Sequence, residues 1–260
     1  MIVAAIQVRM NSPRLPGKAL ADLAGRPVLW HVVQRARAAR RVDQVVIATS
    51  ADPADAPIRA FAESNGIPFY AGSQTDLVDR LHQTAGRFGA RALVRVTADC
   101  PLVDPLVMDQ LVGDFLSHGE TADYVCNTQP PTFPDGLDTE VFPTGLLAKL
   151  SREVSNPFWR EWFTSYLADP LNGFRARNVR HFVDLSALRW TLDYEEDLAF
   201  LREIYGRLYR PGEPPFTMEG VLSLLRSEPA LAALNASHSR NEGYAAALAT
   251  HQVPPGDRPL

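Results

Sequence analysis

IVAAIQV (residues 2–8), VLWHVVQRARAAR (28–40) and QVVIATS (44–50) open the chain as an apolar run, an amphipathic segment and a second apolar run. The apolar spacing of the middle segment, which begins with Val28 and Leu29, predicts a helix between two buried strands. The alternation continues with predicted helices at 56–66, 77–89 and from Pro105, which Asp104 caps, and with predicted strands at 67–71 and 91–97. Such alternation predicts an α/β fold with a mostly parallel, doubly wound sheet.

The second half of the chain is less regular. Strands are predicted at 123–127 and 139–142, and helices at 143–152, 159–167 and 194–209. The proline-rich RPGEPPF (210–216) marks the boundary between an α/β domain, residues 1–210, and a helical C-terminal addition, residues 211–250. The last ten residues, HQVPPGDRPL (251–260), are expected to form a flexible tail.

Composition limits the possible partners. The chain has 26 basic and 30 acidic residues, and neither a nucleic-acid groove nor an anionic membrane surface is expected without a basic excess. Two cysteines are too few for a disulfide framework, which favours a reducing compartment. The chain starts directly on a predicted strand and has no apolar run of membrane-spanning length, so we expect a cytoplasmic protein.

The loop after the first strand concentrates positive charge. It carries Arg9, Arg14 and Lys18, and Pro13, Pro16 and Gly17 keep it from continuing as a helix. A turn at the carboxyl end of a strand can direct backbone amides and cationic side chains at phosphates. The alternative is an ordinary solvated loop. Neither the G-x-x-x-x-G-K-[ST] nor the G-x-G-x-x-G phosphate motif is present.

Two aspartates follow apolar runs elsewhere in the chain and are candidate ligands for Mg²⁺. Asp99 comes after the strand predicted at 91–97, and Asp193 precedes the helix predicted at 194–209. Carboxylates from separate elements, with water and phosphate oxygens completing the shell, suit this cation. As alternatives, Asp99 is a turn residue and Asp193 is a helix N-cap that forms a capping box with Glu196.

Other catalytic chemistries lack their residues. The six histidines and two cysteines show no zinc-ligand spacing, and no G-x-S-x-G motif is present. Cys100, next to Asp99, has no identifiable activating group and is expected to be a small buried apolar residue.

The stretch IQVRMNSPRLPGKAL resembles the N-terminal signature of the sugar-activating cytidylyltransferases, which include the CMP-sialic acid and CMP-Kdo synthetases. The likeness is strongest to the spore coat polysaccharide biosynthesis protein F (SpsF) branch. Further matching blocks are VVIATSADPADAPI, GSQTDLVDRL, VRVTADCPLVDP, TFPDGLDTEVF, RWTLDYEEDLAFLREIY and RNEGY. The resemblance implies a nucleotidyltransferase fold of the GT-A-like, Rossmann-like type, usually homodimeric, that uses Mg²⁺ and CTP.

The resemblance also implies roles for individual residues. Those expected to hold the triphosphate are Arg9, Arg14 and Lys18, and the implied metal carboxylates are Asp99 and Asp193. The residues expected near the nucleoside are Ala48, Thr49, Ser50, Ser73 and Asp76. Those expected on the acceptor side are Asn127, Asp135, Asp138 and Glu140.

Two departures from the branch pattern concern the acceptor. Where the branch commonly has R-E-H-V-T, this chain has REWFT, so Trp162 replaces a histidine and Phe163 replaces a valine. Where the branch commonly has D-T-P-E-D, this chain has DYEED. Both metal aspartates are kept, whereas the indole of Trp162 is expected to reshape the acceptor pocket and to offer a flat surface to a sugar ring.

The implied reaction is transfer of CMP from CTP to an anionic acceptor, such as a sugar acid or a phosphonate, with release of pyrophosphate. One alternative is a glycosyltransferase that uses a nucleotide-sugar donor. Such enzymes usually have a D-x-D motif, to which Asp138-Thr139-Glu140 is the nearest approach here. The other alternative is an inactive nucleotide-binding module, and the presence of Lys18, Asp99 and Asp193 argues against it.

Overall fold

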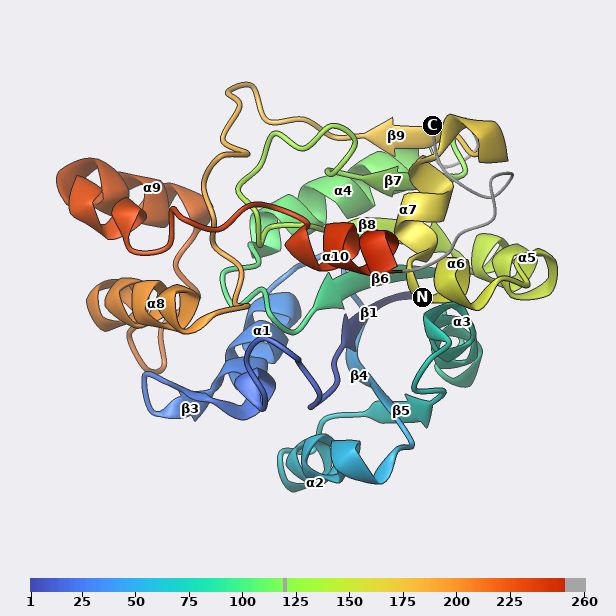
Figure 1. Cartoon of the computed structure of the whole chain (residues 1–260), viewed down its shortest axis with the longest axis horizontal. Coiled ribbons are helices and arrows are strands. Elements are labelled where there is room, and N and C mark those ends of the chain that lie inside the picture. Colours follow the sequence, from blue (N-terminus) through green and yellow to red (C-terminus); the bar gives the residue numbers. More distant parts are fainter. Residues whose placement is uncertain (119–120, 251–260) are drawn as a thin grey trace.

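The computed structural model describes residues 1–118 and 121–250. Its main sheet has seven strands in the order β5-β4-β1-β6-β8-β7-β9 (Figure 1). These strands are β1 Ile2–Gln7, β4 Gln44–Ser50, β5 Phe69–Gly72, β6 Ala92–Thr97, β7 Tyr124–Cys126, β8 Glu140–Pro143 and β9 Ala176–Asn178. A separate small sheet pairs β2 Asp22–Leu23 with β3 Arg26–Pro27.

The main sheet is mostly parallel, as the alternation predicted. Only β8 runs antiparallel, against both β6 and β7, while the other pairings in this sheet are parallel. The register places Gln7, at the end of β1, beside Ala48 of β4 and Thr97 of β6. The carboxyl ends of β1 and β6 therefore lie side by side, which brings the loop after β1 next to Asp99.

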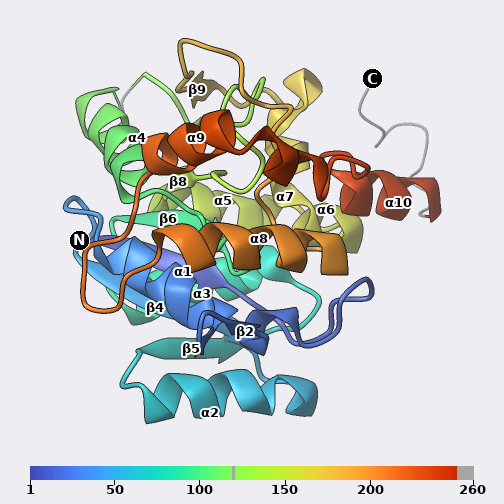
Figure 2. The same cartoon turned by 90° about the vertical axis from the view of Figure 1, so that its left-hand side faces the viewer.

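Helices cover both faces of the sheet because the strand side chains alternate between two apolar clusters. One cluster contains Ile2, Ala4 and Ile6 of β1, and the other contains Val3 and Ala5. The first is covered by α1 Val28–Arg37, α2 Ala56–Ser64, α4 Pro105–His118, α8 Glu195–Leu208 and α9 Met218–Ser227 (Figure 2). The second is covered by α3 Leu77–Arg87, α5 Thr144–Glu153, α6 Pro157–Glu161 and α7 Phe163–Ala168.

One predicted helix cap is confirmed by the structure, and one predicted helix is wrong. The side chain of Asp104 accepts a hydrogen bond from Leu106 N at 2.7 Å, which confirms it as the cap of α4. The single helix predicted at 159–167 is wrong, because the chain forms two short helices that meet at Trp162. The backbone of Trp162 is not helical, with φ −102° and ψ 39°, and its ring packs against Phe158 and Tyr244.

The C-terminal residues return to the α/β body. Val221 and Leu225 of α9 are buried in the cluster that α8 also covers. Buried Asn235 then donates hydrogen bonds to Arg189 O at 3.0 Å and to Asp197 Oδ1 at 2.9 Å. The last helix, α10 Glu242–Thr250, lies in front of β6 and β8 in Figure 1. The tail expected at 251–260 lies outside the described residues, and none of the described helices is both long and apolar enough to cross a bilayer.

Candidate active site

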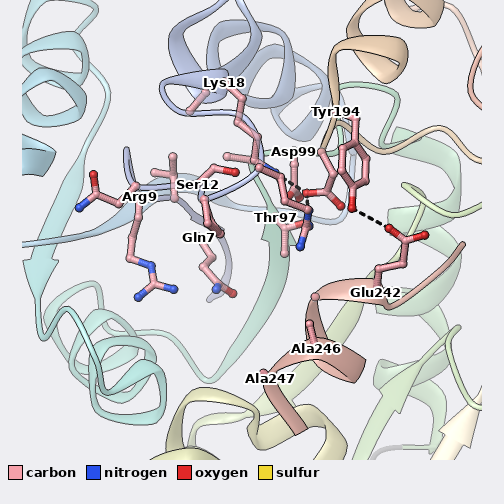
Figure 3. A pocket seen from close by; sticks show the side chains of 18 of the residues that line it. Gln7, Arg9, Ser12, Lys18, Thr97, Asp99, Tyr194, Glu242, Ala246 and Ala247 are labelled. Carbon is pink, nitrogen blue, oxygen red and sulfur yellow. Dashed lines mark hydrogen bonds and ion pairs between the residues drawn. The ribbon is translucent and has the colours of Figure 1, made fainter. Parts of the chain in front are cut away.

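A cavity of about 910 Å³, here called the first cavity, opens at the carboxyl edge of the sheet. Its walls are the loop after β1, the end of β6, Trp162 between α6 and α7, the residues before α8, and α10. Figure 3 shows Lys18, Asp99 and Tyr194 around this cavity, with Ala246 and Ala247 of α10 on the other side. The basic loop is therefore not simply solvated, because it forms one wall of a cleft.

Both candidate metal carboxylates meet at Lys18. Its Nζ lies 2.8 Å from Asp99 Oδ2 and 2.7 Å from Asp193 Oδ1, and it also donates to Leu192 O at 2.6 Å. Arg14 Nη2 lies 2.6 Å from the same Asp193 oxygen. The structure thus brings together two of the predicted phosphate-binding cations and both predicted metal carboxylates; these four residues are called the Lys18 cluster below.

Local backbone geometry positions the cluster. Gly17 has φ +75°, a left-handed conformation that suits glycine, and it precedes the 3₁₀ turn Lys18–Leu20. On the opposite side, Leu192 N donates to Asp99 O at 2.8 Å. This bond ties the residues before α8 to the end of β6, so Asp99 and Asp193 are held at one point of the sheet edge.

The charges of the cluster stabilise one another. Burial lowers the pKa of Lys18, but the charges of Asp99 and Asp193 outweigh it and raise that pKa above its ordinary value. Burial raises the pKa of Asp99, but the Lys18 charge and hydrogen bond outweigh it and lower the value to about 2. The point where the two carboxylates converge therefore favours a positive charge.

The carboxylate pair fits a hard divalent cation. Asp99 and Asp193 reach a single cationic atom with one oxygen each, so both can face the same ion. Within the described ranges, no group of three or more His, Cys, Asp or Glu side chains could hold a metal. An ion at Asp99 and Asp193 would take its remaining ligands from water and substrate, as Mg²⁺ commonly does.

The alternative role of Asp193 as the cap of α8 is wrong. Tyr194 is the N-cap residue, and the expected partner Glu196 is replaced by Asp197. Asp197 Oδ2 accepts from the backbone N–H groups of Asp193 at 2.8 Å and Tyr194 at 3.0 Å. Asp197 in turn binds the Arg189 guanidinium, with contacts of 2.8 and 2.9 Å. The Asp193 carboxylate therefore does not cap the helix: its Oδ1 joins the Lys18 cluster and its Oδ2 lies 3.5 Å from Arg189 Nη2.

A second cavity of about 540 Å³ adjoins the first, and Trp162 and Arg9 line both. Three ion pairs line the second cavity, namely Arg9–Glu161 at 2.6 Å, Arg95–Glu140 at 2.6 Å and Arg240–Asp138. Asp138, Glu140 and Trp162, all predicted on the acceptor side, are thus brought together in one cavity.

Asn127 and Asp135, also predicted on the acceptor side, are not among the residues that line these two cavities. Asn127 is fully buried and bridges Leu137 O and Thr139 N at 2.9 Å each. Asp135 lies 3.4 Å from Arg189 Nη1. Burial and the nearby Asp138 raise the pKa of Asp135 to about 7. Both residues therefore shape the loop behind the second cavity.

The residues predicted near the nucleoside lie beside the site, but none of them lines either cavity. They are Ala48, Thr49, Ser50, Ser73 and Asp76. Ser50 donates to Asp55. Asp76 caps α3 and accepts a hydrogen bond from Arg160 Nε at 2.6 Å. The side chains of Ser50 and Asp76 are thus engaged with the ends of β4 and α3, whereas the buried hydroxyl of Thr49 has no partner among the described residues.

Arg80 was missed by the sequence analysis. Its side chain is fully buried on α3, and its Nη1 donates to Ser73 O at 2.7 Å. Its Nε and Nη2 have no hydrogen-bond partner among the described residues. Burial lowers the pKa of Arg80 to about 10. An arginine on the apolar face of the predicted helix 77–89 was the available signal.

The fold and the site together define a nucleotidyltransferase-like class of protein. The sheet is mostly parallel with one antiparallel strand, and at its carboxyl edge a basic loop faces two carboxylates. Within this class, a sequence profile of the cytidylyltransferases matches residues 3–205. The chain belongs to the cytidylyltransferase family, which confirms the resemblance seen in the sequence.

Individual relatives agree with the family. The chain is 28% identical over 232 residues to spore coat polysaccharide biosynthesis protein SpsF of Bacillus subtilis, covering 86% of this chain and 93% of the relative. It is 39% identical over 111 residues to 3-deoxy-manno-octulosonate cytidylyltransferase of Geobacter sulfurreducens, covering 43% of this chain and 44% of that relative. A solved cytidylyltransferase from Leptospira borgpetersenii is similar in structure, with a TM-score of 0.84, 27% identity, and coverage of 89% of this chain and 96% of that one.

Proposed function

We propose that the protein transfers CMP from CTP to a small anionic acceptor, a sugar acid or a phosphonate-like compound, with release of pyrophosphate and with Mg²⁺ as cofactor. The Lys18 cluster at the first cavity, with the second cavity directly beside it, is the observation that carries the proposal. Membership of the cytidylyltransferase family supports the nucleotide, and the name of the Geobacter sulfurreducens relative, which includes a sugar acid, supports the acceptor class.

Arg9, Arg14 and Lys18 are proposed to hold the triphosphate. Each of them forms an ion pair with a carboxylate: Arg9 with Glu161, Arg14 with Asp193, and Lys18 with both Asp99 and Asp193. These pairs keep the guanidinium and ammonium groups oriented toward the cavity before substrate arrives. Phosphate oxygens then take over part of these contacts, which are strong because donor and acceptor are both charged.

Asp99 and Asp193 are proposed to hold the Mg²⁺. When bound, this ion neutralises charge on the phosphates and helps to orient them. Lys18 remains next to the same carboxylates and supplies a second positive charge, fixed by Leu192 O. Preorganised charge of this kind needs no rearrangement when the transition state forms.

The chemistry is a displacement at phosphorus. An acceptor oxygen forms a bond to the α-phosphorus of CTP while the bond from that phosphorus to the bridging oxygen breaks, and pyrophosphate leaves in line. The protein contributes positioning and charge stabilisation. A phosphonate oxygen that attacks is already ionised and needs no protein base, whereas the hydroxyl of a sugar acid loses its proton to solvent as the new bond forms.

The nucleoside is proposed to lie near Ala48–Ser50 and the loop from Ser73 to Asp76. Arg80 is proposed to take part here, although it lines neither cavity: its Nη1 donates to Ser73 O, and its buried Nε and Nη2 are unpaired donors of the kind that pair with the carbonyl oxygen and ring nitrogen of cytosine. The acceptor is proposed to occupy the second cavity beside Asp138, Glu140 and Trp162, with the loop that carries Asn127 and Asp135 behind it.

Pyrophosphate release tests the proposal. The protein is incubated with Mg²⁺ and each of CTP, UTP, GTP and ATP, together with 3-deoxy-manno-octulosonate, N-acetylneuraminate, a sugar phosphate or a phosphonate. We expect release with CTP and an anionic acceptor, and its loss on chelation of Mg²⁺ or in Asp99→Asn. Equal release with all four nucleotides, or none with CTP, would contradict the proposal. We further propose a homodimer, which light scattering measures directly.

A further inference from the structure

The segment Arg240–Tyr244 connects the two cavities. It lies outside residues 3–205, the part of the chain that the family profile matches. Arg240 and Tyr244 line the second cavity, whereas Glu242 and Gly243 line the first. A part of the chain outside the matched region therefore forms a wall shared by both proposed substrate pockets.

Specific contacts hold this segment in place. Glu242 accepts hydrogen bonds from Tyr194 Oη at 2.7 Å and from Ser239 N at 2.6 Å (Figure 3 shows the first of these). Gly243 packs so closely on Arg14 that a Cβ at this position would lie 2.8 Å from Arg14 Nη1. The segment is thus attached to the residue before α8 and to the basic loop, so its side chains have defined positions.

Arg240 differs from the other arginines that line the second cavity. Arg95 uses two nitrogens, donating from Nε to Gln7 and from Nη1 to Glu140. Arg9 also uses two, donating from Nη1 to Gln74 O and from Nη2 to Glu161. Arg240 Nη2 contacts Asp138.

The other terminal nitrogen of Arg240 lacks a partner. Its side chain is only 15% exposed, and Nη1 is buried without a hydrogen-bond partner among the described residues. A buried donor of this kind costs free energy unless a ligand or water satisfies it.

The surroundings of Arg240 favour an anionic ligand with a ring. Burial raises the pKa of Asp138, although the charge of Arg240 lowers it, so the carboxylate depends on this guanidinium. Asp138 in turn fixes one edge of the planar group and leaves the remaining N–H groups to a ligand. The rings of Trp162 and Tyr244, with centroids 5.3 Å apart, form an apolar wall of the same cavity.

We propose that Arg240 recognises the anionic group of the acceptor, donating from Nη1 to a carboxylate or phosphonate oxygen, while Asp138 holds the guanidinium in position. This inference rests on the proposed function and assigns the selection of an anionic acceptor to a residue of the RNEGY block, outside residues 3–205 that the family profile matches. An acid would satisfy the buried donor with a charge-assisted hydrogen bond, whereas its neutral ester would leave the arginine without a second negative partner.

Calorimetric titration tests the assignment. 3-Deoxy-manno-octulosonate, N-acetylneuraminate and their methyl esters are titrated into protein saturated with CMP. We expect the wild type to bind at least one acid more tightly than its ester, and Arg240→Gln to weaken acid binding by about tenfold or more. Arg240→Lys, which keeps the charge but not the fork geometry, is expected to be intermediate.

Arg226→Gln is the matched control, because Arg226 is an exposed arginine of α9 that lines neither cavity. It should bind acids as the wild type does, and thermal melting checks that all variants fold. Unchanged acid binding in Arg240→Gln, or a wild type that binds acids no better than esters, would overturn the assignment. CTP binding is measured in parallel. A wild type that binds no CTP would overturn the proposed function instead, so the two failures are distinct.

Discussion

Lys18 is the side chain on which the proposed chemistry depends most. Its ammonium lies between two carboxylates and is only 12% exposed. Lys18→Ala should reduce kcat by about a hundredfold or more, because a preorganised charge beside the reacting phosphates is lost. Pyrophosphate release at saturating CTP measures the effect.

The chain provides its own control for this substitution. Lys149 is the only other lysine in the sequence, and it lies half-exposed on α5, 3.9 Å from Glu153. Lys149→Ala should keep the activity of the wild type. Lys18→Ala should also melt at a lower temperature, because Asp99 and Asp193 lose their shared partner. Turnover of Lys18→Ala within twofold of wild type would rule out the phosphate-binding role of the loop.

Asp135 should make stability depend on pH. Its ordinary pKa of 3.8 is raised to about 7 by burial and by Asp138, against the lowering effect of Arg240 and Arg189. At a pH between these two pKa values, the Asp135 carboxyl is protonated in the folded protein and ionised in the unfolded chain. The free energy of unfolding therefore contains a component that falls as the pH rises through this range, by at most about 1.4 kcal/mol per pH unit.

Asp135→Asn isolates this component, because asparagine has the same shape and no proton to lose. Urea unfolding of both proteins at about pH 5 and about pH 8 gives the comparison. We expect the wild type to lose more stability than Asp135→Asn between the two conditions. Parallel behaviour of the two proteins would show that Asp135 is ionised in the fold at both pH values.

The contact between α10 and the basic loop should influence nucleotide binding. Gly243→Ala places a methyl group 2.8 Å from Arg14 Nη1. The side chain of Arg14 is flexible and can move aside, so the fold should survive while the arginine leaves its position beside Asp193. We expect the KM for CTP to rise roughly three- to tenfold, as for the loss of one oriented charged contact.

Gly145→Ala on α5 serves as the control, because a Cβ there meets nothing within 4 Å. It should leave the KM for CTP unchanged and stabilise the helix slightly. If Gly243→Ala and Gly145→Ala both behave as the wild type does, Arg14 does not contribute to nucleotide binding.

The break between α6 and α7 should affect the choice of acceptor. Trp162 occupies the break, and its indole lines both cavities. Trp162→His removes most of a large flat surface and introduces a polar ring, so the KM values for different acceptors should change and their ranking should alter. The Kd for CTP, which depends on the Lys18 cluster, should change by less than about twofold.

Fluorescence or calorimetric titration of CTP, next to acceptor kinetics, separates the two effects. A weaker affinity for CTP with an unchanged acceptor ranking would place Trp162 on the nucleotide side. The break itself could not be predicted from the local pattern of residues 159–167, because it accompanies packing of the Trp162 ring against Tyr244, far along the chain.

Much of the fold could be predicted from the local pattern of apolar residues in the sequence. Buried parallel strands are continuous apolar runs, so β1, β4 and β6 were predicted within one or two residues of their observed ends. The edge strand β9 was not, because its residues are exposed or half-buried and form no apolar run. Its pairing with β7 depends on tertiary structure alone.

The candidate site was predictable where it depends on strand ends. Asp99 and the loop that carries Lys18 were found because each follows an apolar run that forms a parallel strand, and parallel strands end at one edge. Asp193 also follows an apolar run, but that run forms no strand, and the hydrogen bond from Leu192 N to Asp99 O brings it to the same edge. The direct pairing of these three residues was not predicted, since it depends on the fold that joins them. Arg80 and Arg240 were missed because an isolated arginine in sequence usually lies in solvent. Burial of each is created by segments far away in the chain.

Binding of CTP should stabilise the entire chain, since the first cavity is built from five separate parts of the sequence, from the loop after β1 to α10. A ligand that binds only the folded state, present at a hundredfold its Kd, adds about 2.7 kcal/mol to the free energy of unfolding. For a chain of this length the melting temperature should rise by about 5 to 10 °C. Thermal melting with Mg²⁺ and each of CTP, UTP, GTP and ATP measures this shift.

The four melting curves, together with one variant, locate the source of this stabilisation. We expect the largest shift with CTP, because Arg80 and the residues around it are proposed to contact the base, and a smaller shift with nucleotides that share only the triphosphate. Lys18→Ala should lose most of the shift with every nucleotide, because the shared phosphates contact its ammonium. Equal shifts with all four nucleotides would show that the base is not recognised and would remove Arg80 from the site. A full shift in Lys18→Ala would place the triphosphate away from the two aspartates, and the proposed geometry of the reaction would then be wrong.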